Sequence, residues 1–320
     1  MEERFLLSNI NTSFNEQFKL YTKDIQKYLD DPLVMEIMLN PDGTIWLDKA
    51  GQDMFPTETI LSPSSVERIT SLVASRSKTI VTEATPIISS ELPDGSRFEG
   101  LVSPVVEKPV FSIRKHGSLV MTLEDYINKD IITTEQKVFF ENAVLERKNI
   151  LVAGSTGSGK TTFVNALVHA VSTLTKDHRI ISIEDTRELK VSSKNWVPLR
   201  TSDLIDMTRL LKSCMRLRPD RILVGEVRGP EALALLKAWN TGHPGGLSTV
   251  HANGALASLT RLEQLLLEAG VPQVGARPII AEAINIVVFL ERTKEGRKVT
   301  QIIEVKGFSD GFYETETILS

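Results

Sequence analysis

The chain has 320 residues, of which 41% are apolar. It is long enough for about two domains that each bury a core, which excludes a disordered tail protein. A formal net charge of −4 at pH 7 excludes an overall field that would draw the chain onto nucleic acid or anionic lipid. The single cysteine, Cys214, excludes an internal disulfide and a four-cysteine zinc cluster. Because the N-terminus is acidic where a secretory signal is basic, and no apolar run is long enough to span a membrane, we expect a cytosolic protein.

The first third of the chain mixes helix and strand patterns. A capping-box pattern at residues 13–16, followed by apolar residues at spacings of four and three, predicts an opening helix of about 18 residues. Strands are expected at residues 34–39, 44–47 and 110–114, and a second helix is expected to begin near Pro63. This mixture is typical of a small α+β domain.

Beyond about residue 133 the pattern changes, because strands and helices alternate there in the βαβ manner. A polar stretch with one short helix separates the two parts. The sequence therefore predicts an α/β protein with three segments: an N-terminal α+β domain over residues 1–114, a linker over residues 115–132 and a second domain over residues 133–320.

A complete phosphate-loop motif opens the second domain. Residues 154–161 read Gly-Ser-Thr-Gly-Ser-Gly-Lys-Thr and match G-x-x-x-x-G-K-[ST] between a predicted strand and a predicted helix. The glycines let backbone N–H groups turn toward phosphate oxygens, Lys160 adds a charge at the β- and γ-phosphates, and the hydroxyl of Thr161 suits Mg²⁺. A glycine-rich turn that only joins strand to helix is disfavoured, because every motif position is met in the required context. We therefore expect ATP and Mg²⁺ to bind at Gly154, Ser155, Thr156, Gly157, Ser158, Gly159, Lys160, Thr161 and Thr162.

Two acidic residues follow two further predicted strands. The strand at residues 179–183 ends in Glu184, and the strand at residues 221–225 ends in Glu226. Because ligand sites in open parallel sheets lie at the carboxyl ends of the strands, both acids are expected in one crevice with the phosphate loop. We expect Glu184 to activate the attacking water and Glu226 to support Mg²⁺ through its water shell. Taken singly, each acid could equally be a solvated charge at a strand end.

The segment at residues 242–253 combines three glycines, a proline and two histidines around a short predicted strand. This composition suits a loop that senses the terminal phosphate, and it favours a functional role for His251 but not for His243. A metal site on this histidine pair is disfavoured, because no further Cys or His lies nearby in the sequence.

Cys214 belongs to a helical apolar pattern. It is predicted to share one helix face with Leu204, Met207, Leu211 and Arg218. We therefore interpret Cys214 as a small core residue and assign no chemistry to it.

The order of four segments resembles the traffic ATPases of bacterial type II and type IV secretion; these segments are residues 154–161, 181–189, 217–229 and 241–253. Residues 238–243 and 261–265 look most like the ATPases of conjugative transfer within that family. The resemblance implies a RecA-like P-loop domain with a smaller PAS-like N-terminal domain, assembled as a six-membered ring.

The resemblance also assigns roles to single residues. It equates residues 154–161 with the Walker A motif, Glu184-Asp185 with the Asp box, Glu226 with the Walker B acid and His251 with the His box. Many P-loop enzymes place Asp where this chain has Glu226, but the secretion family has Glu, which argues against an ordinary kinase.

Two N-terminal arginines also receive a role from the resemblance. The family sends N-terminal-domain arginines toward the γ-phosphate, and the matching positions in this chain are Arg97 and Arg114. Taken from the sequence alone, both would be solvated surface residues. A cation added at the γ-phosphate would stabilise charge in the transition state as an arginine finger does.

Three classes of function compete for these observations. The first is a ring-forming ATPase of conjugative transfer or type IV secretion, with a motor of a tight-adherence or type IV pilus as its nearest alternative. The second is a small-molecule kinase, and the third is a nucleotide-gated switch, which the paired acids and His251 disfavour. The single cysteine excludes the four-cysteine zinc module that type II exporters usually carry. For the first class we expect a homo-oligomer that binds inner-membrane components from the cytoplasmic side, without direct contact to nucleic acid.

Overall fold

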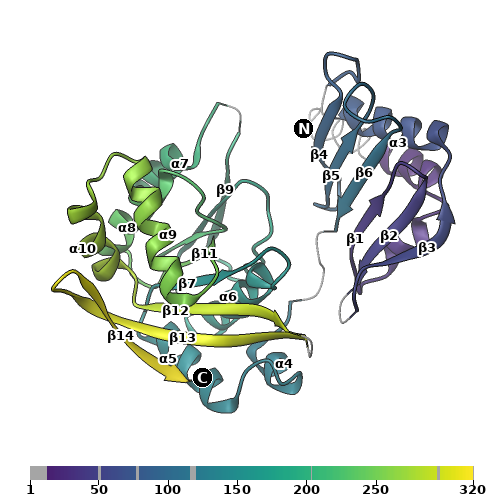
Figure 1. Cartoon of the computed structure of the whole chain (residues 1–320). Coiled ribbons are helices and arrows are strands. Elements are labelled where there is room, and N and C mark those ends of the chain that lie inside the picture. Colours follow the sequence, from purple (N-terminus) through teal and green to yellow (C-terminus); the bar gives the residue numbers. More distant parts are fainter. Residues whose placement is uncertain are drawn as a thin grey trace. The chain divides into compact units, whose positions relative to one another are not determined.

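The computed structural model describes residues 13–49, 52–76, 79–115, 120–202, 204–293 and 296–319. The chain divides into two compact units, Met1–Leu119 and Val120–Ser320 (Figure 1). Each unit has its own sheet and its own hydrophobic core.

The first unit is built on a six-stranded antiparallel sheet with the strand order β3-β2-β1-β6-β5-β4. Its strands are β1 (Val34–Leu39), β2 (Thr44–Lys49), β3 (Phe55–Ile60), β4 (Ile87–Glu91), β5 (Arg97–Leu101) and β6 (Val110–Arg114). Helix α3 (Pro63–Arg76) buries Val66, Ile69 and Val73 against the sheet. Apolar residues three and four positions apart on this helix therefore cover the apolar face of the sheet and complete the core.

The opening helix is interrupted where the sequence predicts a continuous one. Residues 13–21 are helical, residues 22–25 form a turn, and α2 (Gln26–Asp30) follows. The Thr22 hydroxyl donates to the Phe18 carbonyl at 2.7 Å, and such side-chain bonds compete with the backbone ladder of a helix. The predicted apolar stripe is nevertheless inside, because Phe14 and Ile25 are buried in the core of the first unit.

The second unit contains an eight-stranded sheet with the order β14-β13-β12-β7-β11-β10-β8-β9. The six strands from β12 to β9 run parallel, and β13 and β14 add an antiparallel edge. The strands are β7 (Ile150–Gly154), β8 (Ile180–Glu184), β9 (Trp196–Arg200), β10 (Arg221–Val224), β11 (Leu247–His251), β12 (Ile286–Thr293), β13 (Gly296–Ser309) and β14 (Phe312–Leu319). The central strands are buried on both faces, as expected for a parallel sheet.

Helices cover both faces of this sheet (Figure 1). Successive residues of β7 belong to different cores: Ile150 and Val152 pack with α5 and α6, whereas Leu151 and Ala153 pack with the helices of the other face. The helices are α4 (Leu123–Asn128), α5 (Thr134–Leu145), α6 (Lys160–Leu174), α7 (Met207–Cys214), α8 (Glu231–Asn240), α9 (Ala255–Glu268) and α10 (Gln273–Ala283), with a 3-10 turn, η1, at Met215–Leu217. The second unit is therefore a three-layered α/β unit.

Part of the segment predicted as a linker packs into the second unit. Tyr126 of α4 contacts Phe163 of α6 edge to face, with 5.2 Å between ring centroids. Leu123 and Ile132 lie in the same core cluster. Residues 120–132 thus contribute to the hydrophobic core of the second unit. The division of the chain into residues 1–114, 115–132 and 133–320 stays a prediction from the sequence.

Helix α7 is shorter than the predicted apolar face. The Asp206 carboxylate caps its start by accepting the Arg209 N–H at 2.7 Å, so Leu204 precedes the helix and is 88% exposed. Arg218 follows the helix at a φ of 54°, next to Pro219, and also lies outside the predicted face. The interpretation of Cys214 is confirmed, because its side chain is fully buried among apolar residues.

In the described part of the chain, each helix is too short or too polar to cross a lipid bilayer.

Burial raises the pKa of the Cys214 thiol to about 11, so the thiolate, which is the reactive form, is scarce at pH 8. We expect a disulfide reagent at pH 8 to label Cys214 about 100-fold more slowly in the native chain than in the chain unfolded in guanidinium. Absorbance of the released thiolate measures both rates. Equal rates would contradict the burial of Cys214.

Candidate active site

Four neighbouring parallel strands, β7, β11, β10 and β8, end at one edge of the second sheet. Gly154 and His251 are the last residues of β7 and β11, and they are paired in the register. Glu184 ends β8, and Glu226 comes two residues after the end of β10. Strand polarity and register therefore bring residues from four distant segments to the same edge.

The phosphate loop connects β7 to α6. Gly157 and Gly159 have φ values of 73° and 94°, a region that side chains with a Cβ rarely adopt. Gly154 is needed for space, because a Cβ at this position would lie 2.5 Å from the Leu290 carbonyl oxygen. Lys160 is the first residue of α6, so its charge lies at the positive end of the helix.

Two donors of the phosphate loop, the Lys160 ammonium and the Ser158 N–H, share the Ser155 carbonyl oxygen as acceptor. The Lys160 ammonium donates to the carbonyl oxygens of Gly154 and Ser155, at 2.9 Å each. The Ser158 N–H donates to the same Ser155 oxygen at 3.3 Å. The side chains of Thr161 and Thr162 are half-buried in the first turn of α6.

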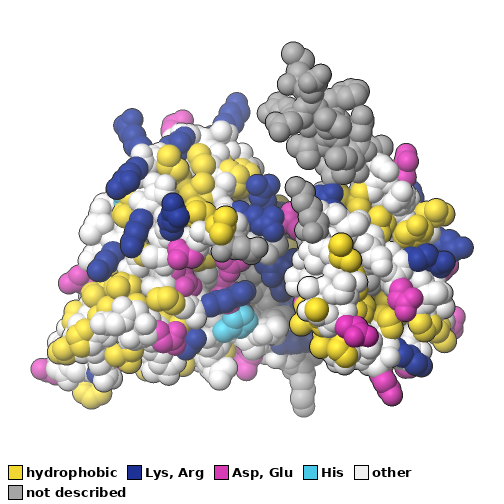
Figure 2. Space-filling model, turned by 90° about the horizontal axis from the view of Figure 1, so that it is seen from above, with side chains coloured by type: hydrophobic (Ala, Val, Ile, Leu, Met, Phe, Trp, Pro, Cys, Tyr) yellow, Lys and Arg dark blue, Asp and Glu magenta, His cyan; other side chains and the backbone are white. Residues whose placement is uncertain are grey.

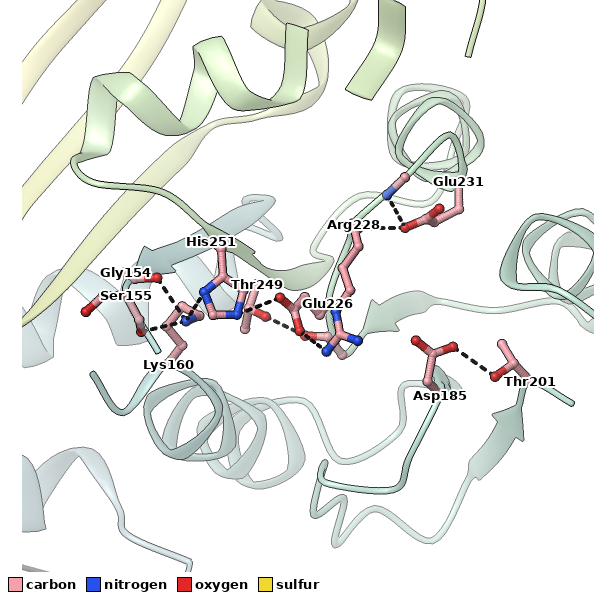
Figure 3. Close-up of polar contacts among 12 residues, drawn as sticks. Gly154, Ser155, Lys160, Asp185, Thr201, Glu226, Arg228, Glu231, Thr249 and His251 are labelled. Carbon is pink, nitrogen blue, oxygen red and sulfur yellow. Dashed lines mark hydrogen bonds and ion pairs between the residues drawn. The ribbon is translucent and has the colours of Figure 1, made fainter. Parts of the chain in front are cut away.

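His251 lies between the phosphate-loop lysine and the acid that follows β10 (Figure 3). Its Nδ1 is 3.3 Å from the Lys160 Nζ, and its Nε2 is 2.9 Å from the Glu226 Oε1. Because an ammonium group has only donors, Nδ1 must accept and Nε2 carries the ring proton toward Glu226. The three side chains therefore form one chain of polar contacts.

Arg228 extends this chain toward solvent. It donates to the Glu226 Oε2, and this hydrogen bond raises the pKa of the Arg228 guanidinium. Glu231 accepts the N–H groups of Arg228 and Gly229 at 2.7 and 2.9 Å, which fixes the turn before α8 (Figure 3). Sequence reasoning gave Arg228 no role, although it lies in a segment that carries the family resemblance. Its position two residues after Glu226 was the available signal.

Glu184 is almost fully buried beside the same edge. Its Oε1 accepts the backbone N–H groups of Glu188 and Leu189 at 2.8 and 2.9 Å, so it holds the loop that follows β8. A Cβ at Gly225 would lie 3.2 Å from the Glu184 Cγ, so the glycine before Glu226 provides space for Glu184.

The described side chains contain no cluster of three or more His, Cys, Asp or Glu residues that could hold a metal. The Glu226 Oε1 is buried, and the His251 Nε2 lies 2.9 Å from it in a contact that lacks hydrogen-bond geometry. A cation or a metal-bound water would satisfy this oxygen, so the Glu226 carboxylate fits the water shell of the Mg²⁺ of a bound nucleotide.

Arg97 and Arg114 lie in the first unit. They are directly opposite each other on β5 and β6, and Arg114 also faces Glu36 of β1. On its other side Arg97 faces Glu91 of β4, so the two arginines lie side by side between two acids in one row across the sheet.

The parallel sheet, the phosphate loop and the acids at the strand ends define a P-loop α/β nucleotide-binding unit. Comparison with known proteins identifies the family. The sequence profile of the type II/IV secretion system proteins matches residues 21–302. The conjugal transfer protein TrbB of Rhizobium radiobacter is 45% identical over 289 residues, which cover 90% of this chain and 88% of that protein. The type IV secretion system protein VirB11 of Bartonella henselae is 33% identical over 325 residues, covering 87% and 90% of the two chains.

Solved structures show the same fold. The X-ray structure of the Legionella pneumophila ATPase DotB has a TM-score of 0.65 at 16% identity and covers 88% of this chain and 79% of that chain. The structure of the pilus retraction motor PilT with ADP has a TM-score of 0.63 at 19% identity, covering 95% and 83%. The chain therefore belongs to the type II/IV secretion system protein family. The predicted fold class and the resemblance drawn from the motifs are confirmed.

Proposed function

We propose that this chain is an ATP hydrolase that powers conjugative transfer or a related type IV secretion system. The observation that carries the proposal is the continuous contact from the phosphate-loop Lys160 through His251 to Glu226. A loop that only joined a strand to a helix would have no need of a histidine and an acid aligned behind its lysine.

The phosphate loop binds ATP by exchanging one set of acceptors for another. Lys160 and the Ser158 N–H already point at the same carbonyl oxygen, that of Ser155. Phosphate oxygens carry more negative charge than a carbonyl and replace it as the acceptor of both donors. Thr161 and Glu226 would hold Mg²⁺, which supplies positive charge to the phosphate oxygens when bound.

His251 makes the acid sensitive to the occupant of the loop. Its Nδ1 contacts the Lys160 ammonium, so a shift of that ammonium toward phosphate changes the charge beside this ring nitrogen. The opposite nitrogen is 2.9 Å from Glu226, and the acid in turn accepts from Arg228. The terminal phosphate is thereby coupled to the turn before α8.

Glu184 is the proposed base for the attacking water. Its Oε1 accepts two backbone N–H groups, and the carboxylate is proposed to accept the proton of the water. The two N–H donors fix the orientation of the carboxylate, as a positioned base requires. Glu226 contacts His251 and Arg228, which suits an electrostatic and metal-supporting role.

Arg97 and Arg114 are proposed to supply positive charge to the γ-phosphate. The cross-strand pairing of two arginines in the first unit supports this, because two adjacent guanidinium groups can donate to the oxygens of one phosphate. Binding of both units to one nucleotide would convert hydrolysis into a domain movement.

The proposed assembly is a homo-oligomeric ring, a hexamer, that docks on inner-membrane components from the cytoplasmic side. Figure 2 shows Lys and Arg side chains gathered toward the upper left of the view, but the chain as a whole has a net charge of −4, which suits protein partners better than a nucleic-acid backbone. The names of the TrbB and VirB11 relatives favour conjugation over the alternative of a pilus motor.

The Lys160→Ala substitution tests the site. We expect ATP turnover to fall by about 100-fold or more, because the loop loses its charge at the phosphates. Release of inorganic phosphate without an added acceptor measures turnover and separates a hydrolase from a kinase, and light scattering reports the assembly. Lys176→Ala, at an exposed lysine beyond the end of α6, is the matched control and should keep normal turnover. Normal turnover in Lys160→Ala would end the assignment.

The two acids are distinguished by amide substitutions. Glu184→Gln keeps an acceptor for the Glu188 and Leu189 N–H groups but removes the base, so we expect unchanged ATP affinity and at least about 100-fold lower kcat. Glu226→Gln should instead weaken the dependence on Mg²⁺. Both are measured by nucleotide titration and by turnover at several Mg²⁺ concentrations. Normal turnover in Glu184→Gln would move the base to Glu226 or another group.

Arg114→Ala tests the role of the first unit. We expect kcat to fall by about 1000-fold, the scale of an arginine finger, while ATP affinity changes far less. Arg68→Ala, at an exposed arginine of α3, serves as the control of equal charge. Equal losses of affinity and of kcat would mean that Arg114 only binds nucleotide.

A further inference from the structure

One arginine from the far end of the sequence contacts the phosphate loop. Arg297 lies at the start of β13, and its Nε donates to the Gly157 carbonyl oxygen at 3.0 Å, across 140 positions of sequence. The sheet explains this proximity, because β12 pairs with β7 so that Leu290 is opposite Gly154, and β13 turns back along β12. The β12–β13 hairpin thereby reaches the outer side of the loop.

This contact acts on a peptide bond that matters for phosphate binding. In a trans peptide the carbonyl and the following N–H point in opposite directions. The Gly157 carbonyl points outward to Arg297, whereas the Ser158 N–H points across the loop to the Ser155 oxygen at 3.3 Å. Lys160 donates to that same oxygen. A guanidinium that holds the carbonyl outside therefore keeps the N–H aimed inside, beside the lysine.

The stem of the arginine also follows the loop. A Cβ at Gly159 would lie 3.1 Å from the Arg297 Cδ and 3.8 Å from its Nε, so the side chain passes directly over this glycine. Gly159 has a φ of 94° and begins α6 as its N-cap. Arg297 thus contacts two glycines of the loop that have a positive φ: it donates a hydrogen bond to the Gly157 carbonyl and packs over Gly159.

We propose that Arg297 is a positioning residue of the phosphate loop. It holds the peptide between Gly157 and Ser158 in the orientation that presents its N–H to the nucleotide. The inference rests on the proposed role of residues 154–161 in nucleotide binding, and it ties the antiparallel β12–β13 hairpin to that role.

The position of the contact separates this role from that of an arginine finger. Arg297 binds a loop carbonyl from outside and acts through the backbone, whereas a finger touches the γ-phosphate and acts on kcat. The backbone N–H groups of a phosphate loop bind the α- and β-phosphates, which ADP and ATP share. Loss of Arg297 should therefore weaken both nucleotides alike, which raises KM and leaves kcat nearly unchanged.

The test compares Arg297→Ala with Lys298→Ala in the full-length chain. Lys298 is the next residue of the same strand, so its side chain points to the opposite face of the hairpin. We expect Arg297→Ala to bind ATP and ADP about tenfold more weakly, the effect of losing one hydrogen bond from a charged donor. Its kcat should stay within about twofold, and Lys298→Ala should match the wild type. Titration with both nucleotides and steady-state phosphate release give these values.

Three results would overturn the inference: unchanged affinities, a loss confined to ATP, or a loss of kcat that exceeds the rise in KM. The melting temperature without nucleotide distinguishes a loop effect from a damaged fold, because Arg297→Ala and Lys298→Ala should then melt alike. Lys160→Ala keeps the two proposals separate. If that variant binds and turns over ATP normally, the site assignment itself fails, whereas a normal Arg297→Ala beside an inactive Lys160→Ala contradicts only the role of Arg297.

Discussion

The site depends on how the Lys160 ammonium is held at the buried start of α6. An ammonium removed from water needs acceptors, and this one is supplied with two loop carbonyls and the Nδ1 of His251. The two carbonyls are neutral, so they hold the ammonium without cancelling its charge. The histidine contacts both this lysine and Glu226, which is the arrangement that the proposed coupling needs.

The register of the parallel sheet makes this arrangement available. Because Gly154 pairs with His251 across β7 and β11, the two ends of the polar chain start from fixed backbone positions. A shift by one residue would send His251 to the other face of the sheet and break its contacts with both neighbours. The central strands are buried on both faces, so a change of register would disrupt their packing on each side.

Sequence reasoning found the parts of the site that short motifs encode. The rule that parallel strands present ligands at their carboxyl ends predicts that the phosphate loop, Glu184 and Glu226 share one crevice, and the composition of residues 242–253 points to His251. The sequence did not predict that Glu184 accepts N–H groups of the loop after β8, because this depends on the direction of its side chain. It also did not predict the contact of Arg297 with the phosphate loop, because Arg297 lies on a hairpin 140 positions away. The fold was predicted in the same way: β1 and β6 match the expected strands, whereas the opening helix is interrupted at Thr22 by a hydroxyl bond that periodicity does not register.

The burial of Cys214 has a practical consequence for testing the proposed movement of the two units. Since the only cysteine of the chain is buried, a cysteine introduced on the surface of each unit would carry the accessible thiols of the molecule. A donor and an acceptor dye attached there would report the separation of the units in the intact chain during turnover. The natural sequence thus needs no removal of background thiols before the proposed domain motion can be tested by fluorescence.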